Sequence, residues 1–210
     1  MAADGVYCPG RLPGGKLVRM ANAEHQHHEH AHPGHGEAGH VHDASCAVAH
    51  GDAVAPTEGK VLVAVFATPV ARYLLRYGAD AGYRPVLIEP DAERAKQIAG
   101  DGFELADSLK KFPVDRTDFV VTDHHRPELG VQLRDALAAG TRWVGIMGNP
   151  RHAAPHVAAL TDLGVPASEI NKVHRPIGLN IGSHTPAEIA IATLAGLIAD
   201  RNGKPGGFEF

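Results

Sequence analysis

Apolar and polar positions alternate in a regular rhythm along residues 60–210, where short apolar runs are followed by amphipathic stretches with glycine, proline or aspartate between them. Short aliphatic runs are typical of strands buried on both faces, and amphipathic stretches are typical of the helices that cover them. This alternation predicts an α/β fold with a parallel sheet. We expect strands at 61–67, 86–89, 119–122 and 143–147, and helices at 69–81, 91–99, 127–139, 151–163 and 186–203.

Two of the expected helices begin with recognisable capping residues. The side chain of Asp91 can accept hydrogen bonds from the first backbone N–H groups of its helix. The last helix opens with Thr185, Pro186 and Glu188, which place a hydroxyl at the N-cap, a proline at the first helical position and a carboxylate at the third. These residues predict a capping box at the start of the last helix.

The first 59 residues have a different composition. They hold seven acids and three bases, and nine of the fifteen histidines, but few large apolar side chains. Such a segment cannot bury a core. We therefore predict a disordered, histidine-rich tail at 1–59 and a folded domain at 60–205.

Composition excludes several classes of protein. The formal net charge of -4 gives no electrostatic footprint for nucleic acid. Cys8 and Cys46 are the two cysteines, too few for a disulfide framework. The chain shows neither an apolar run of membrane-spanning length nor the pattern of a signal peptide. We expect a cytoplasmic protein that binds neither nucleic acid nor membrane.

Ligands of parallel α/β sheets bind beyond the carboxyl ends of the strands. Four loops are expected there, at 67–70, 122–126, 147–151 and 176–185. His124, His125, Arg126 and Arg151 lie in two of them and suit an anionic ligand. Each of these side chains, taken singly, has a solvated loop position or a helix cap as its alternative.

The first strand-to-helix turn argues against a dinucleotide site. A dinucleotide fingerprint requires glycines there, and residues 67–71 contain none. Thr68 can still cap the following helix and offer its hydroxyl. Glu89 stands about 20 residues on, where a ribose-binding acid belongs, but we favour its alternative, a solvated strand end.

The longest motif in the chain is HRPIGLNIGSHTPAEIA, at residues 174–190. It resembles the PIGLDIGA.TPEEIA signature of the xanthine dehydrogenase accessory factor family, XdhC/CoxI. Upstream, WVGIMGNPR at 143–151 resembles the family's YVGxIGSRR segment, and VVTDH at 120–124 resembles its VVxTHD stretch. The resemblance covers residues 60–200 and implies the family's C-terminal Rossmann-like domain. Asn180 replaces the family's usual Asp, and Asn149 with Pro150 replaces Ser-Arg.

The resemblance implies a maturation factor for a molybdenum hydroxylase, such as xanthine or carbon monoxide dehydrogenase. Such a factor binds molybdenum cofactor and passes it to the apoenzyme, so it is a cofactor chaperone more than an enzyme. A cysteine desulfurase is a further expected partner, and the chain could pair with a second copy. Glycines in the signature would let backbone approach the ligand. The residues expected to bind the cofactor are Thr68, His124, His125, Arg126, Gly148, Asn149, Arg151, Gly178, Asn180, Gly182 and Thr185.

The histidine-rich tail supports a second hypothesis, the storage or delivery of a transition metal. Imidazole suits nickel, zinc and copper, and closely spaced histidines put several within reach of one ion. Incidental affinity of a solvated tail is the alternative. A third hypothesis, an NAD(P)-dependent oxidoreductase, keeps the fold but lacks the glycine turn. The expected metal ligands are His25, His27, His28, His30, His32, His35, His40 and His42.

Overall fold

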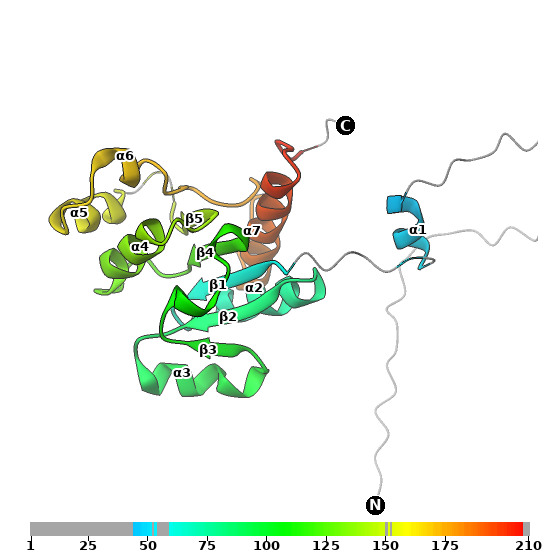
Figure 1. Cartoon of the computed structure of the whole chain (residues 1–210), viewed down its shortest axis with the longest axis horizontal. Helices are drawn as coiled ribbons and strands as arrows, with labels where there is room; N and C mark the ends of the chain where they lie inside the picture. Colours follow the sequence, from blue (N-terminus) through cyan, green and yellow to red (C-terminus); the bar gives the residue numbers. More distant parts are fainter. Residues whose placement is uncertain (1–43, 52, 54–58, 150, 152, 208–210) are drawn as a thin grey trace, which may run out of the picture. The chain divides into compact units, whose positions relative to one another are not determined.

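Figure 1 shows the computed structural model, which describes residues 44–51, 53, 59–149, 151 and 153–207. The predicted disorder of the tail therefore falls largely outside the described residues, as do its expected metal ligands. Within the segment predicted as a tail, Ala44–His50 forms a seven-residue helix, α1, that the sequence pattern did not predict. None of the described helices is long and apolar enough to cross a membrane.

The domain is built on a five-stranded sheet in the order β3-β2-β1-β4-β5, with every pair of neighbours parallel. This confirms the predicted α/β fold, and the order has the Rossmann pattern. β3 was not predicted, because its three residues carry no apolar run. The strands are β1 (Val61–Val65), β2 (Arg84–Ile88), β3 (Glu104–Ala106), β4 (Thr117–Val121) and β5 (Trp143–Ile146).

Helices flank the sheet. The expected helix at 151–163 begins only at residue 155, where a proline occupies the first turn and fixes a helical φ. The helix α6 was not predicted, since four residues are too few for a periodic signal. The helices are α2 (Pro69–Asp80), α3 (Ala92–Ile98), α4 (Leu129–Ala138), α5 (Pro155–Asp162), α6 (Ala167–Ile170) and α7 (Pro186–Arg201).

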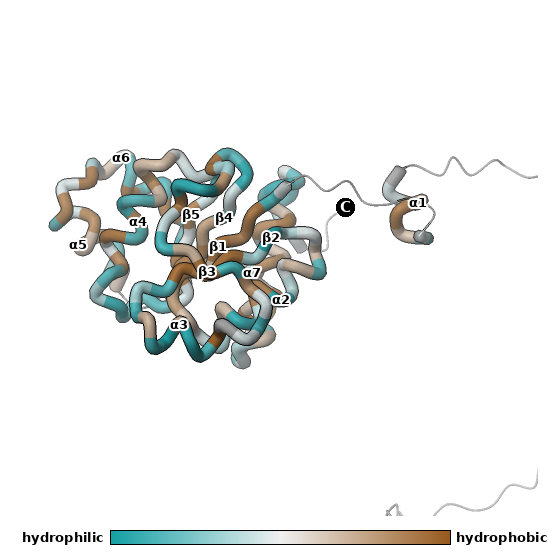
Figure 2. Tube along the Cα trace, turned by 60° about the horizontal axis from the view of Figure 1, so that its bottom comes forward, coloured by the Kyte–Doolittle hydropathy of each residue, from teal (hydrophilic) through white to brown (hydrophobic). Residues whose placement is uncertain are grey.

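Two hydrophobic clusters pack on the two faces of the sheet. Successive side chains of β1 alternate between them, as a pleated strand requires. Leu62 joins the cluster with residues of α2 and α7, and Val63 joins the cluster with residues of α4 and α5. Figure 2 shows the hydrophobic residues concentrated along the central strands. Burial on both faces explains why β1 is a continuous apolar run.

The helix α7 packs along α2, and its end is bonded to the sheet. Its last residue, Arg201, bonds the buried Asp118 near the amino end of β4 at 2.9 Å. Sixteen residues span about 24 Å at the helical rise per residue. The start of α7, where Thr185 and Glu188 form the predicted capping box, therefore lies well away from Asp118.

Candidate functional site

The first βα turn is closed by the protein's own groups. The Ala67 N–H donates to Glu89 Oε2 at 2.7 Å, and the Thr68 N–H donates to the Phe66 carbonyl at 3.0 Å. The Ala71 N–H donates to Thr68 Oγ1 at 3.0 Å, so this hydroxyl caps α2. These are N–H groups of the kind that hold a pyrophosphate in a dinucleotide-binding turn. A carboxylate already occupies part of that position.

Glu89 is held by a buried ion pair. Its side chain is 0% exposed and that of Arg126 is 10% exposed, with Nη2 of Arg126 3.0 Å from Oε1 of Glu89. The guanidinium also stacks over the Phe66 ring, 4.8 Å from its centroid. Burial lowers the pKa of Arg126, but the charges of Glu89 and Glu128 outweigh it, and the pKa is raised. The expected solvated strand end at Glu89 is therefore wrong, and the structure gives Arg126 this partner in place of the anion we expected.

Hydrogen bonds also join the carboxyl ends of β1 and β4, where a dinucleotide would cross. Thr68 donates to Thr122 Oγ1 at 2.9 Å. The Thr122 hydroxyl is buried and lies 2.9 Å from the Val65 carbonyl and 3.0 Å from that of Phe66. Thr68, expected to bind the cofactor, instead joins α2 to the end of β4.

Beyond β4 and β5 a basic cluster forms, which we define as His124, His125, His156 and Arg175. The rings of His124 and His125 lie 4.0 Å apart between centroids. The Arg175 guanidinium bonds the carbonyls of Asn149 at 2.8 Å and Ala153 at 3.0 Å. Arg175 was not among the expected site residues, although it directly precedes Pro176 of the signature, and this position is the sequence signal that could have identified it.

Gly148 makes room for the guanidinium. A Cβ at this position would lie 2.8 Å from Arg175 Nε, closer than real Cβ contacts. The absence of a side chain at Gly148 therefore serves the placement of Arg175, and the glycine belongs to the edge of the basic cluster.

Two imidazoles of the basic cluster have lowered pKa values. His156 is 5% exposed, and its Nδ1 has no hydrogen-bond partner among the described residues. Burial lowers its pKa, and the charge of Arg175 lowers it further. Burial, His125 and Arg175 together lower the pKa of His124. The cluster thus combines the permanent charge of Arg175 with two imidazoles whose ring N–H groups can donate hydrogen bonds, which suits an anion.

The remaining expected residues of the β5 loop and α7 are exposed. Asn149 Oδ1 accepts from the Arg151 N–H at 2.9 Å, which tightens the loop locally. Asn180 carries an exposed side chain, and Thr185 caps α7. The exposed His125 joins the cluster through its ring contact with His124.

The signature loop divides into two parts. Gly178 has φ +85°, and a Cβ there would lie 2.9 Å from the Ala192 carbonyl carbon of α7. Leu179 donates its N–H to the Ala192 carbonyl at 3.0 Å. Gly182 has φ +68° and open space around it. Our expectation that the whole loop lines the crevice is wrong for residues 178 and 179, which pack on the middle of α7 because glycine permits this close approach.

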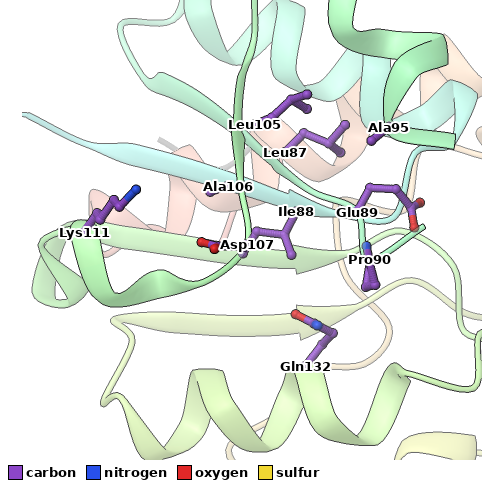
Figure 3. Close-up of a pocket in the computed structure, with 10 residues that line it drawn as sticks. All are labelled: Leu87, Ile88, Glu89, Pro90, Ala95, Leu105, Ala106, Asp107, Lys111 and Gln132. Carbon is purple, nitrogen blue, oxygen red and sulfur yellow. The ribbon is translucent and has the colours of Figure 1, made fainter. Parts of the chain in front are cut away.

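A cavity of about 480 Å³ opens at the carboxyl ends of β2 and β3 (Figure 3). Its walls include Ile88, Ala106 and Leu105, and Asp107 and Gln132 supply polar groups. This cavity could not be predicted from sequence, because the short strand β3 carries no apolar run. Elsewhere, no group of three or more His, Cys, Asp or Glu side chains suited to a metal occurs among the described residues.

Comparison with known proteins shows the family to which the chain belongs. A family model described as the XdhC Rossmann domain matches residues 62–197. The uncharacterized protein YqeB of Escherichia coli (strain K12) is 38% identical over 65 residues, which are 31% of this chain and 12% of YqeB. A Bacillus halodurans structure described as a xanthine dehydrogenase has a TM-score of 0.56 at 23% identity, over 69% of this chain and 45% of that one. The match thus spans less than half the length of either relative.

Proposed function

The chain belongs to the family of the XdhC Rossmann domain, and from this premise we propose that it is an accessory factor for a molybdenum hydroxylase of the xanthine dehydrogenase type. In this role it binds molybdenum cofactor and delivers it to the apoenzyme. Its partners are that apoenzyme and a cysteine desulfurase that supplies the terminal sulfur. The proposal makes the chain a cofactor chaperone and requires no reaction centre of its own.

The observation that carries the proposal is the basic cluster at the carboxyl ends of β4 and β5. Molybdenum cofactor is a pterin that bears a phosphate, and its anion needs a cation and hydrogen-bond donors. Burial lowers the pKa of both His124 and His156, and the charge of Arg175 lowers each of them further. Gly148 leaves room for the guanidinium. The residues present therefore fit a phosphate-bearing group, with Arg175 as its principal ligand.

The closed first turn argues against the oxidoreductase alternative. A nicotinamide dinucleotide places its pyrophosphate against the N–H groups of this turn. The carboxylate of Glu89 lies 2.7 Å from the Ala67 nitrogen, so it competes for the same donor and repels a second anion. An NAD(P) role would require the Glu89–Arg126 pair to open.

Molybdenum cofactor, when bound, supplies the metal and pterin chemistry of the client enzyme, and this chain holds and releases it.

The test is to purify the full chain anaerobically from its host and to measure molybdenum and the fluorescence of oxidised pterin. Replacement of Arg175 by Met should lower retained pterin at least tenfold, because a charge-assisted contact is lost. Arg134→Met is the matched control, since the side chain of Arg134 on α4 is 43% exposed and pairs with Asp135. Arg175→Lys keeps the charge without the fork and should retain an intermediate amount.

Two results would overturn the proposal. One is a wild-type chain that carries no molybdenum and no pterin while its client enzyme matures equally well in a strain that lacks it. The other is a nicotinamide cofactor in the purified protein, which would restore the oxidoreductase alternative. Thermal unfolding of each variant separates a lost ligand contact from a misfolded loop.

A further inference from the structure

We propose that the cavity at the ends of β2 and β3 binds a planar heterocycle through its 2-amino-4-oxopyrimidine edge, with Asp107 as the recognising residue. The cavity volume of about 480 Å³ falls within the range of about 300–1,000 Å³ typical of small-molecule sites. The choice of ligand class rests on the proposed function, because a pterin carries this edge. Guanine carries the same edge, so the chemistry is shared by a pterin and by the base of a guanine nucleotide.

The walls of the cavity suit a flat ring. Ile88 and Ala106 end the two strands, and Ala95 adds a small side chain from α3. Leu105 lines the same cavity and remains 45% exposed. Aliphatic walls of this kind bury the faces of a heterocycle and leave recognition to the polar groups at its edge.

The polar side chains of the cavity are available to a ligand. Asp107, Lys111 and Gln132 all line it (Figure 3), and none of their side chains forms a hydrogen bond or ion pair with any residue that the structure describes. Glu89, which also lines the cavity, differs because its carboxylate is bound to Ala67 and Arg126. Asp107 is therefore the carboxylate that remains open in this cavity.

A carboxylate has two oxygens that accept hydrogen bonds side by side. The 2-amino-4-oxopyrimidine edge presents a ring N–H and an adjacent amino group, which are two parallel donors. Its oxo group can accept from the Gln132 amide. Adenine presents an amino group beside a ring nitrogen that accepts, so a carboxylate would meet one donor and one repelling lone pair. Asp107 thus selects pterin and guanine over adenine.

Lys111 adds a cation to the same cavity. An ammonium binds a phosphate as a point charge. We expect it to favour the phosphorylated form of a ligand whose ring is held by Asp107. Lys111 affects phosphate-bearing probes, whereas Asp107 affects every probe that has the aminopyrimidinone edge.

The experiment titrates the full chain with 6-hydroxymethylpterin, guanosine, GMP and adenosine, using pterin fluorescence and calorimetry. Asp107→Asn should weaken 6-hydroxymethylpterin or guanosine about tenfold or more, the size expected for a hydrogen bond to a charged group. Asp162→Asn is the matched control, because Asp162 is exposed at the end of α5. Lys111→Met should weaken GMP and leave guanosine unchanged.

The probes also distinguish the sources of the edge. Binding of 6-hydroxymethylpterin alone identifies the pterin as the occupant, and binding of guanosine alone identifies the base of a dinucleotide cofactor. The inference is overturned if no probe binds, if adenosine binds as tightly as the others, or if Asp107→Asn binds like the wild type. The Arg175 experiment measures retained molybdenum and pterin independently of these titrations. The proposal for the cavity can therefore be overturned while the accessory role is supported, and the accessory role can be overturned while the cavity still binds its ligand.

Discussion

One buried carboxylate decides what the first βα turn can bind. Glu89 accepts hydrogen bonds from the N–H groups of Ala67 and Asp91 and from the Arg126 guanidinium. Arg126 stands 37 residues later in the chain and stacks on Phe66. The side chain that resembles a ribose-binding acid by its position is therefore a structural link between β2, the first turn and the loop after β4.

Replacing Glu89 by Gln should destabilise the domain by about 3 kcal/mol, because Arg126 would stay buried without its counter-charge. Urea unfolding of the full chain measures this difference. The control is Glu93→Gln, which removes an exposed partner of Lys96 and should change stability by less than about 1 kcal/mol. Equal stability of the two variants would contradict the role given to the buried pair.

His156 predicts a pH dependence of stability. Burial, followed by the charge of Arg175, lowers its pKa in the folded protein, whereas the unfolded chain takes up this proton near pH 6.5. Below about pH 6.5 the unfolded state thus binds more protons than the folded state, so stability falls as the pH decreases through this range. The full contribution is present at a pH above the unfolded pKa.

The measurement is the free energy of unfolding between pH 8 and pH 5 for the wild type and for His156→Gln. The wild type should lose more stability on acidification than the variant, whose side chain does not titrate. His124, whose pKa is also lowered, acts in the same direction and remains in both proteins. Parallel curves for the two proteins would show that His156 contributes nothing to the acid sensitivity.

Among the elements, α7 is secured at its two ends by different means. Thr185 and Glu188 satisfy each other's backbone groups in a local capping box. The other end relies on Asp118, a fully buried carboxylate that binds Arg201 of α7 and Arg142 before β5. The first link is local in sequence, and the second joins three separate segments at the amino edge of the sheet.

Asp118→Asn should therefore cost about 3 kcal/mol of stability, since two partly buried guanidinium groups lose their shared counter-charge. Asp200→Asn is the matched control, because Asp200 also pairs with Arg142 but is 42% exposed. It should cost less than about 1 kcal/mol. Chemical denaturation compares them, and a larger loss from Asp200→Asn would place the critical link on the surface.

At the scale of the whole molecule, the question is whether the histidine-rich segment and the domain act separately. Both hydrophobic clusters of the domain are formed from Val61 onward. A chain of residues 60–210 should consequently fold with a thermal midpoint close to that of the full chain. A marked drop in this midpoint would show that residues 1–59 contribute to the stability of the domain.

The same deletion tests the metal hypothesis. Histidines with an ordinary pKa near 6.5 bind metal when neutral and release it on protonation, so nickel retention by the full chain should fall between about pH 7 and pH 5. The chain of residues 60–210 should retain little nickel at either pH. If the client enzyme still matures after deletion of residues 1–59, the tail has an accessory role. If maturation fails and added nickel or copper restores it, the result favours metal delivery by the tail.

Local features of this protein could be predicted from sequence because they depend on neighbouring residues. The alternation of apolar runs predicted β1, β2, β4 and β5, and the residues around Thr185 predicted the capping box. Hydrophobic periodicity and capping act within one or two turns, so they are visible in the chain itself. The short elements β3 and α6 were missed, since three or four residues carry too little pattern.

The sequence by itself determined the class of fold, the start of α7 and, through the signature at 174–190, the family. Only the tertiary structure decided which polar side chains form ion pairs or hydrogen bonds within the protein and which stay available to a ligand. Glu89 pairs with Arg126, 37 residues away, and Asp118 pairs with Arg201, 83 residues away. Asp107 pairs with no residue that the structure describes, and it lines a cavity bounded by β3, a strand that was not predicted. The physical reason is that burial and pairing of charges depend on the order of strands and the path of loops, and these bring together residues that no local pattern connects.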